Sequence, residues 1–590
     1  MILVFGGTTE GRTAIKTLEE AGNVYYYSTK TGEQDVVMHH GRRIDGAMNG
    51  QAMRQFCQGH DIRLIVDAAH PFAKVLHQTI ADVAEALHLP VVRFERIYPP
   101  RDPSLTWIDD YGELASLPTP VTLLATTGVQ SIARLKPLED RGIRIFYRIL
   151  NRPSSIALAK AQGAAEQQLC YYEDAGDIPV EADAILLKES GESGGFAEKV
   201  KAAKARGMEI IVLRRPPMPT GFHLVDGEHG LRRMVEHLLP EFYSLHSGLT
   251  TGTCATAAAL AAAIRLAKGE MPDEVPVRLP NGETISVSVG YGEDYACCIK
   301  ESGDDPDVTD GIEIRAHVER AADFEIRGGE GIGRFTLPGF DFPPGEAAIN
   351  RVPREMIRQN IQLLCDQLSI SNFQSSIFSL QFSIILSVPN GREIALRTFN
   401  PRLGIEGGIS IIGVSGIVKP YSEEAFVQSI RKCMEVARAS EAERVVIGSG
   451  MKSEQQLRRL YPDLPRQAFV EYGNYIGETL RMADELGFSH VTLGIMIGKA
   501  VKLAQGHLDT HSRRVTMDKA FVAQLLREAD CSSEVLARVA GITVARELWD
   551  LLTPDEAQRF SQVIVSHCRE HCAPLLPDGE LTILLLRSGD

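Results

Sequence analysis

Residues 1–12 read MILVFGGTTEGR. The apolar run 2–5 is typical of a buried strand, and the glycine-rich turn GGTTEGR (6–12) follows it directly. An amphipathic stretch, 13–20, comes next, so the turn joins a strand to a helix. This order predicts a βα unit of a parallel sheet, and the chain repeats it up to about residue 240.

The repeats predict an α/β fold with two Rossmann-like lobes of parallel sheet. A proline-rich stretch, RIYPPRDP (96–103), reads as a hinge, which puts the lobes at about 1–97 and 104–242. Further apolar runs occupy 64–66, 91–94, 122–124, 143–149, 185–187 and 210–213.

The pattern of apolar and polar residues changes after residue 242. We interpret 243–247 as a linker, because PEFYSLHSG (240–248) follows a helical pattern and carries no strong periodicity. The remainder, 248–590, mixes strand-like runs (275–279, 285–289 and 382–388) with glycine loops and separate helices. That mixture predicts an α+β body rather than regular βαβ winding.

Composition narrows the class of protein. The chain has 590 residues and a net charge of -15, which argues against a general nucleic-acid binder. Neither a signal peptide nor a membrane span is expected, and the ten cysteines form no disulfide framework. We therefore expect a cytoplasmic protein without nucleic-acid or membrane partners, and a homo-oligomer stays open.

Four polar motifs of the first half follow apolar runs: GGTTEGR (6–12), DAAHP (67–71), TTG (126–128) and KESGESGG (188–195). In open α/β sheets, ligands bind beyond the carboxyl ends of the strands, so these motifs predict one shared cleft.

The glycine turn is a candidate for binding a pyrophosphate through Gly6, Gly7, Thr8 and Gly11, although a ligand-free tight turn explains it equally well. Lys30 follows a hydroxyl pair at the second strand end and would suit the 2′-phosphate of NADPH, or is a surface lysine.

Three further side chains allow two readings each. His70 is a candidate proton donor or a helix cap before Pro71. Lys188 and Arg148 are candidates for binding a substrate carboxylate, or are ordinary surface groups.

The first half resembles the precorrin-6A reductase family over nearly all of 1–242. The carrying stretches are FGGTTEGR, VDAAHPFA, RFER, LLATTG, YRIL and LLKESGESGGFAEKV. The resemblance implies hydride transfer from NADPH or NADH to a carbon–carbon double bond of a corrin-ring intermediate, with His70 and Lys188 as catalytic candidates. The substrate candidates are Thr127, Gly128, Arg148, Ser190 and Gly194.

In the second half, LTTGTC (249–254) precedes an Ala-rich helix, so Thr251, Gly252 and Thr253 form either an anion nest or an ordinary cap. The acidic loop KESGDDPDVTDG (300–311) either binds a cation or is a solvated turn.

Glycine loops at 400–408 and 413–418 would leave room for a flat ligand or an adenosyl group. His507 and His511 have metal-ligand spacing, but hydrogen-bonded loop histidines are the preferred interpretation, and no metal site is expected.

The second half resembles the cobalt-precorrin-5B (C1)-methyltransferase family over about 246–590. The carrying stretches are LTTGTCATAAA, VRLPNGE, KESGDDPDVTDG, GEGIGRFTLPGF, RTFNPRLGIEGGISIIGVSGIVKPYS and IGKAVKLAQGHLDTHS. Asp310 stands where the family often has histidine, which puts an acid–base role there in doubt. The resemblance implies S-adenosylmethionine as methyl donor, and the usual Rossmann methyltransferase glycine motif is missing.

The methyltransferase candidates follow from those motifs. Catalytic candidates are Asp305 and His507; cofactor candidates are Thr251, Gly252, Thr253, Asp304, Glu406, Gly407, Gly408, Ser415 and Gly416; substrate candidates are Arg402 and Lys499. Together the two halves predict a bifunctional enzyme of cobalamin biosynthesis. The alternative is a reductase fused to a non-catalytic corrin-binding scaffold. A sugar-nucleotide oxidoreductase is disfavoured because no Tyr-x-x-x-Lys pair follows the TTG motif.

Overall fold

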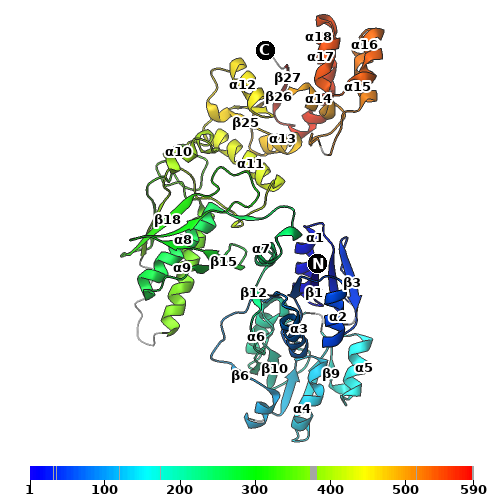
Figure 1. The fold of residues 1–590 in the computed structure, drawn as a ribbon, viewed down its shortest axis with the longest axis vertical. Helices are drawn as coiled ribbons and strands as arrows, with labels where there is room; N and C mark the ends of the chain where they lie inside the picture. Colours follow the sequence, from blue (N-terminus) through cyan, green and yellow to red (C-terminus); the bar gives the residue numbers. More distant parts are fainter. Residues whose placement is uncertain are drawn as a thin grey trace. The chain divides into compact units, whose positions relative to one another are not determined.

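The computed structural model describes residues 1–590 except 31, 33, 35, 119, 173, 372–381, 513 and 588–590. The chain forms two compact units (Figure 1). Unit 1 comprises Met1–Ser247 and Arg278–Ser286, and unit 2 comprises Gly248–Val277 and Val287–Asp590.

Unit 1 begins with a parallel sheet in the order β12-β5-β4-β1-β2-β3. Its central strands alternate their side chains between two buried faces, so that Ile2 and Val4 pack under α1 and α7 while Leu3 and Phe5 pack under α2 and α3. The strands are β1 Ile2–Phe5, β2 Tyr25–Thr29, β3 Gly41–Asp45, β4 Leu64–Asp67, β5 Val91–Phe94 and β12 His223–Val225.

A second parallel sheet, in the order β6-β11-β10-β7-β8-β9, repeats this strand arrangement. In the first sheet the chain starts at β1 near the middle, winds outward to β3, and then returns to β4 on the other side of β1. In the second sheet β6 lies at the edge, and the same winding starts at β7, continues to β9 and returns to β10 on the other side of β7. The order therefore reverses between β1 and β4, and again between β7 and β10. The strands are β6 Thr106–Ile108, β7 Thr122–Ala125, β8 Arg144–Arg148, β9 Leu169–Cys170, β10 Ala184–Lys188 and β11 Glu209–Leu213.

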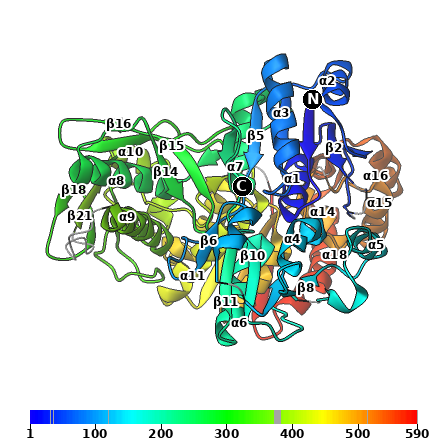
Figure 2. The same ribbon diagram turned by 90° about the horizontal axis from the view of Figure 1, so that it is seen from below.

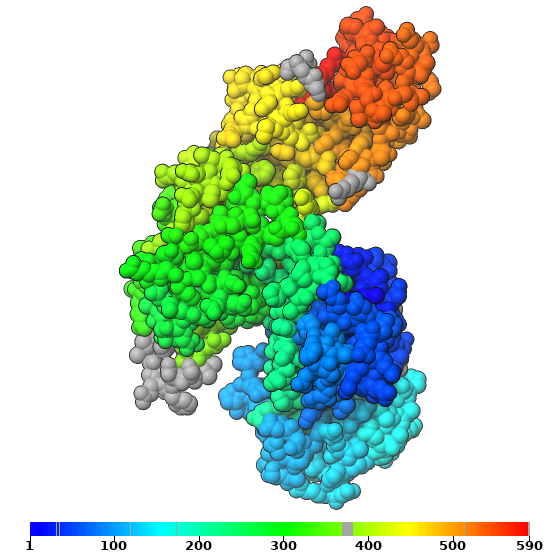
Figure 3. Space-filling view, viewed as in Figure 1, coloured from blue at the N-terminus to red at the C-terminus, as the bar shows by residue number. Residues whose placement is uncertain are grey.

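Helices cover both sheets, and the space-filling view shows the surface passing without a break from the blue first lobe to the cyan second lobe (Figure 3). The helices of unit 1 are α1 Thr9–Glu19, α2 Gly50–Gly59, α3 Lys74–Leu87, α4 Ile132–Glu139, α5 Pro153–Ala161, α6 Phe196–Ala205 and α7 Glu228–Leu238.

The expected second lobe, 104–242, contains segments that pack on the first sheet. Strand β12 pairs with β5, and Leu231 and Val235 of α7 are buried in the core of the first sheet. The chain thus crosses to the second sheet and comes back, a return that local periodicity does not reveal.

The segment 243–247 is fastened to the surface of unit 1. The Tyr243 hydroxyl donates to the Thr17 carbonyl at 2.9 Å, and Tyr243 is 3% exposed. The backbone N–H and hydroxyl of Ser247 donate to the Glu236 carboxylate at 2.9 and 2.6 Å. Arg232 donates to the same carboxylate and to the Leu245 carbonyl, so this stretch has a fixed path along α7.

Unit 2 starts with a long helix that is buried from Thr251 to Ile264. This helix, α8, packs on β17 and β18 of a five-stranded sheet in the order β16-β17-β18-β21-β19, and against α9 (Figure 2). Small alanine side chains allow this close approach on several sides. The elements are β13 Gly248–Leu249, α8 Thr251–Lys268, β16 Gly290–Tyr291, β17 Ala296–Ile299, β18 Glu313–Arg320, β19 Glu325–Gly328, β20 Arg334–Phe335, α9 Arg351–Ser371, β21 Phe382–Ser387, α10 Gly391–Ala395, β22 Ile405–Glu406 and β23 Ile417–Val418. Strands β14 Glu274–Arg278 and β15 Thr284–Ser288 each have residues in both units.

The rest of unit 2 is built on a parallel sheet in the order β25-β24-β26-β27. It has its own apolar core, which includes Val446, Leu493 and Phe560. The elements are α11 Glu423–Ala439, β24 Arg444–Gly448, α12 Met451–Leu460, β25 Phe469–Glu471, α13 Ile476–Glu485, β26 His490–Met496, α14 Ile497–Ala504, α15 Lys519–Glu528, α16 Ser533–Arg538, α17 Leu548–Leu551, α18 Pro554–Cys572 and β27 Glu580–Leu586.

The predicted fold class is confirmed: the first half is parallel α/β, and the second half is a different α+β body. The parallel sheet within that body is a feature that the sequence analysis did not resolve. In the described part of the chain, no helix combines the length and the apolar composition needed to cross a membrane.

Helix α7 provides a test of the fold of unit 1. Its first N–H groups, those of Glu228 and His229, donate to the Glu283 carboxylate at 3.1 and 2.9 Å, and no side chain of its own caps it. An anion at a helix N-terminus stabilises both the free donors and the dipole. We expect Glu283→Gln to destabilise α7 by about 1 kcal/mol, measured by hydrogen exchange of those two amides, whereas the exposed Glu270→Gln leaves them unchanged. Equal exchange in both variants would contradict the cap.

Candidate active sites

The polar motifs of unit 1 lie at the two points where strand order reverses. The Thr8 hydroxyl donates to the Ala68 carbonyl at 2.7 Å, which joins the turn after β1 to the turn after β4. In the second sheet the N–H of Thr126, after β7, donates to the Leu186 carbonyl of β10 at 2.9 Å. The structure therefore gathers all four motifs at the carboxyl edges of the sheets, where open α/β folds bind ligands.

The glycine turn packs against a side chain that the sequence analysis missed. A Cβ on Gly6 would overlap the Tyr27 ring, and one on Gly11 would lie 2.7 Å from the Tyr27 hydroxyl. The N–H of Gly7 donates to that hydroxyl at 2.9 Å, and Thr8 caps α1. Gly6 and Gly11 are thus required for packing, whereas Gly7, with φ of 93°, faces open space and leaves room for a ligand.

Lys30 is exposed beside the end of β2. The neighbouring Thr29 is buried and donates to Asp45 at 3.0 Å, and Arg43 pairs with the same carboxylate at 2.9 Å. Asp45, at the end of β3, thus hydrogen-bonds to the end of the neighbouring strand β2. Only the register between the two strands shows this, because the residues lie far apart in the sequence.

A buried network sits beneath His70. The Asp67 carboxylate contacts Nδ1 of His77 at 2.6 Å and accepts from Arg93 at 3.1 Å. Nε2 of His77 contacts the His70 carbonyl at 3.1 Å, and Arg93 also donates to the Ala69 carbonyl at 2.8 Å. These contacts fix the backbone on both sides of His70, which explains the spacing of VDAAHPFA and RFER.

The His70 ring is held neutral. Burial, assisted by the positive charges of Arg96 and Lys188, lowers the pKa of His70 to about 3. Its Nδ1 accepts from the Phe72 N–H at 3.2 Å, so Nε2 carries the ring proton. At neutral pH His70 is therefore a hydrogen-bond donor rather than an acid, and it does not cap α3, whose N-cap is Ala73.

Arg96 links the two lobes, although we did not single it out from the sequence. Its guanidinium pairs with Glu10 of α1 at 3.1 Å and donates to the Ser190 carbonyl at 2.7 Å. A Cβ on Gly194 would lie 2.9 Å from the same guanidinium, and Ser193 donates to Glu10. The loop 188–195 thus wraps around Arg96 and is glycine-rich because there is no room for larger side chains.

Two lysines give the cleft its positive charge. Burial lowers the pKa of Lys188 to about 8, and that of Lys199, on α6, to about 8 as well. Nζ of Lys188 lies 4.9 Å from the centre of the Phe72 ring, and within the described residues no carboxylate pairs with it. Nζ of Lys199 donates to the Gly194 carbonyl at 2.7 Å. Such incompletely compensated cations suit a ligand that carries carboxylates.

The other predicted substrate residues point into the protein. The Thr127 hydroxyl contacts that of Ser131 at 2.6 Å, and Gly128, with φ of 84°, begins the following turn. Arg148 donates to the Ala175 carbonyl at 2.9 Å and lies over the Tyr172 ring. These residues shape the loops around the cleft.

In unit 2 the threonines at the start of α8 bind the chain itself. The Thr251 hydroxyl accepts from the Ile412 N–H at 2.8 Å, and the Thr253 hydroxyl donates to the Gly416 carbonyl at 2.6 Å. Gly252 donates to the Ile412 carbonyl at 2.9 Å. The structure thus brings 251–253 together with Ile412 and Gly416 in one internal hydrogen-bond network, while Ser415 hydrogen-bonds with Ile417.

The acidic loop neutralises a buried lysine. Nζ of Lys300, which is 1% exposed, pairs with Asp307 at 2.8 Å. Asp310 accepts from the Ser302 N–H at 2.7 Å, and Asp305 accepts from the Tyr421 N–H at 3.0 Å. Asp304 lies in the same loop. Most of these carboxylates therefore order the loop, including Asp310 at the position that departs from the family pattern.

Arg402 and Lys499 meet around one glutamate. Arg402 lies 3.0 Å from Glu454 and 3.6 Å from Glu471. Burial raises the pKa of Glu471, and burial lowers the pKa of Lys499 to about 8 although Glu471 opposes that shift. Perturbed acids and bases gathered at strand ends are typical of functional sites.

The remaining predicted residues are scattered. Glu406 and Gly407 are exposed, while Gly408 is buried and accepts from Asn400 at 3.1 Å. His507 is exposed, and Asp509, between the two histidines, pairs with Arg514 at 2.8 Å.

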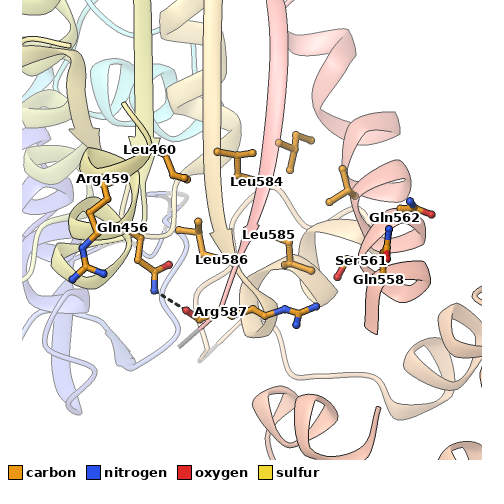
Figure 4. Close-up of a pocket in the computed structure, with 12 residues that line it drawn as sticks. Gln456, Arg459, Leu460, Gln558, Ser561, Gln562, Leu584, Leu585, Leu586 and Arg587 are labelled. Atoms are coloured by element: carbon orange, nitrogen blue, oxygen red, sulfur yellow. Dashed lines mark hydrogen bonds between the residues drawn. The ribbon is translucent and has the colours of Figure 1, made fainter. Parts of the chain in front are cut away.

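A cavity of about 510 Å³ in unit 2 is lined by none of the predicted residues (Figure 4). It lies beside the edge strand β27, between α12 and α18. Its lining is Gln456, Arg459, Leu460, Gln558, Ser561, Gln562, Val565, Ile583, Leu584, Leu585, Leu586 and Arg587.

Comparisons with known proteins identify relatives for both units. Residues 1–233 match the family "Precorrin-6x reductase CbiJ/CobK", 240–420 match "CbiD", and 509–588 match "CbiD, C-terminal domain". The cobalt-precorrin-5B C(1)-methyltransferase of Prosthecochloris aestuarii is 40% identical over 357 residues, which is 59% of this chain and 95% of the relative. That of Geobacillus sp. is 40% identical over 55% of this chain and 89% of the relative. The solved structure of a CobK precorrin-6A reductase is 18% identical, with a TM-score of 0.33, over 40% of this chain and 97% of that one.

The effect of the neighbouring charges on the pKa of His70 can be tested directly. Arg96→Gln removes a positive charge and leaves the negative Glu10 in place, so the pKa of His70 should rise above its value of about 3. Histidine NMR titration measures this pKa, with His70→Gln assigning the signal. Arg101→Gln is the control, because Arg101 pairs with Glu189, 3.0 Å away, and is not among the groups that shift His70. An unchanged His70 titration in Arg96→Gln would refute the electrostatic account.

Proposed function

Since the chain belongs to the cobalt-precorrin-5B C(1)-methyltransferase family, and its residues 1–233 match the precorrin-6x reductase family, we propose that one chain catalyses two steps of cobalamin biosynthesis. Unit 2 methylates cobalt-precorrin-5B at ring carbon 1 with S-adenosylmethionine. Unit 1 reduces the product, precorrin-6A or its cobalt form, with a nicotinamide cofactor.

The reduction adds two hydrogens to one carbon–carbon double bond. The bound nicotinamide supplies a hydride to one carbon, and water or an acid supplies a proton to the other. The open side of the turn at Gly7 and the helix start at Thr8 fit the cofactor's phosphates. His70 donates a hydrogen bond from Nε2 and orients a ring substituent.

The observation that supports this role for unit 1 is that Lys188 pairs with no carboxylate among the residues that the structure describes. This lysine lies in the cleft that also holds His70 and Arg96, in a protein whose net charge is -15. A corrin-ring intermediate carries acetate and propionate groups, and a partly desolvated ammonium binds such a group strongly. The cleft thus attracts a polyanion that the body of the protein repels.

Methyl transfer requires alignment and exclusion of water more than acid–base chemistry. Arg402 lies 3.6 Å from Glu471 and Lys499 interacts electrostatically with the same carboxylate, and we assign both cations to ring carboxylates. The donor's sulfonium is a cation, and nearby carboxylates stabilise it.

Lys188→Ala should raise the KM of unit 1 for its ring substrate by roughly ten-fold or more, because one charge-assisted contact of about 1.5–3 kcal/mol is lost. The nicotinamide KM should stay within two-fold or so. Lys201→Ala, an exposed lysine on α6, is the matched control. An unchanged ring-substrate KM in Lys188→Ala would remove Lys188 from the site.

The lowered pKa of Lys188 predicts that substrate binding by unit 1 depends on pH. Only the protonated lysine attracts a carboxylate, so substrate binding should be strongest well below pH 8 and should weaken as the pH rises through about 8. Lys188→Arg keeps its charge, so in this variant the alkaline loss should shrink. Steady-state KM measured from pH 6.5 to about 9.5 checks this, and identical profiles for both proteins would contradict it.

Both activities can be tested in one reaction. The purified chain is incubated without oxygen with cobalt-precorrin-5B, S-adenosylmethionine and each nicotinamide in turn. Mass spectrometry should show the gain of one methyl group and then of two hydrogens. Methylation without reduction under either nicotinamide would contradict the reductase assignment, and no methylation would favour a scaffold role for unit 2.

A further inference from the structure

The last sheet of unit 2 has a site that its topology specifies. The strands lie in the order β25-β24-β26-β27 and all run parallel, so the chain winds from β24 outward to β25 and then returns to β26 on the other side of β24. The strand order reverses between β24 and β26. In open parallel sheets, ligands bind in the crevice beyond the carboxyl ends at this reversal.

The loop after β24 is built for close approach. Gly448-Ser449-Gly450 connects β24 to α12, and Gly450 has a φ of 158°. The N–H of Gly450 donates to the Ser453 hydroxyl at 3.0 Å, and the hydroxyl returns a bond to the Gly450 carbonyl at 2.7 Å. The turn is thus fixed by its own hydrogen bonds, and its glycines leave the crevice side free of side chains.

Glu471 ends the neighbouring strand β25, about 20 residues after the glycine loop, which is the place of the ribose-binding acid in nucleotide-binding α/β folds. Its Oε1 lies 3.4 Å from the position that a Cβ on Gly450 would take, so the carboxylate faces the loop. Among the described residues no donor hydrogen-bonds to it. The nearest cation, Arg402, lies 3.6 Å away and is closer to Glu454.

The third side of the crevice is cationic. Lys499 lies in the first turn of α14, directly after β26, and its Nζ lies 5.4 Å from the centre of the Tyr472 ring. Nζ donates to the Gly473 carbonyl, which places the ammonium beside the end of β25. The crevice therefore offers a glycine loop, a hydrogen-bond acceptor and a cation on three successive strand ends.

The threonines at the start of α8 do not offer these features. Their hydroxyl and amide groups bind the backbone of 412–416, so a ligand there would have to replace hydrogen bonds that the chain already makes. Glu471, by contrast, has a carboxylate with unused acceptor capacity.

We propose that this crevice binds the adenosine part of the methyl donor, with the Glu471 carboxylate accepting hydrogen bonds from the ribose hydroxyls and the loop 448–450 lying against the nucleoside. This inference rests on the proposed function, which requires a nucleoside-containing methyl donor in unit 2. In this proposal the residues around Glu471 hold the donor, and the loops around α8 do not.

The test uses the full chain and S-adenosylhomocysteine, the product form of the donor, in calorimetric titrations that need no turnover. Glu471→Gln should weaken binding roughly ten- to hundred-fold, as expected for the loss of a charged hydrogen-bond acceptor. Glu478→Gln is the control, since this exposed residue of α13 pairs only with the next turn of its own helix among the described contacts. It should bind as the unaltered chain does.

A second ligand separates direct contact from structural damage. The 2′-deoxyribose analogue of S-adenosylhomocysteine should bind the unaltered chain more weakly, and Glu471→Gln should bind the two ligands about equally, because the contact is already absent. If the losses of affinity caused by Glu471→Gln and by the 2′-deoxy analogue were additive, the contact between Glu471 and the ribose would be refuted. Binding of the methyl donor by unit 2 would still stand. Displacement of S-adenosylhomocysteine by NADPH would assign the crevice to a nicotinamide nucleotide and overturn the proposal. No binding of S-adenosylhomocysteine by the unaltered chain would reject the donor itself, and with it the proposed methyl transfer.

Discussion

In a parallel sheet, the crossover helices leave a crevice open where the strand order reverses, beyond the carboxyl ends of the two strands that meet there. This geometric constraint determines where the candidate sites lie. It applies three times: between β1 and β4, between β7 and β10, and between β24 and β26. At each reversal a glycine-containing turn follows the strand, since only a turn without side chains lets a ligand approach the backbone. The motifs that carry the family resemblance in unit 1 occupy the first two of these places.

Charge is the second property that determines the candidate sites. The chain is acidic overall, yet it buries Arg93, Arg96 and Lys300, each beside a specific carboxylate. A buried ion whose partner is removed destabilises the fold strongly, so these pairs hold loops in place. Lys188 differs because no carboxylate compensates it in the described structure, and its lowered pKa records that deficit. A cation left in this state is suited to bind the substrate rather than to stabilise the loop.

Much of the fold could be predicted from local sequence. The runs 2–5, 64–66 and 185–187 are strands within a residue of their expected ends, because fully buried parallel strands are continuous apolar segments. The return of β12 to the first sheet could not be foreseen, since it depends on pairing with β5, far away in the chain. The parallel sheet of unit 2 was also missed, because its four strands are separated by long helical segments.

The candidate sites, like the fold, could be predicted from the sequence only in part. Lys188 ends a strand and His70 lies shortly after one, so both were found by position. Arg96 and Tyr27, by contrast, act through contacts with residues distant in sequence. Thr251, Thr253 and Asp310 carry polar groups in a suggestive pattern, but those groups bind the chain's own backbone. Polar type and spacing therefore located the sites, and only three-dimensional contacts separate groups that are free to bind from groups that hold loops.

The central claim is that two ligands bind at separate strand-order reversals, one in each unit. Hydrogen–deuterium exchange of the whole chain, with S-adenosylhomocysteine and NADPH added one at a time, tests it most directly. The account predicts protection by S-adenosylhomocysteine at 448–450, 471–474 and 497–499, and by NADPH at 6–12 and 67–73. Protection by S-adenosylhomocysteine at 250–253 and 412–416 instead, or protection of one common segment by both ligands, would contradict it.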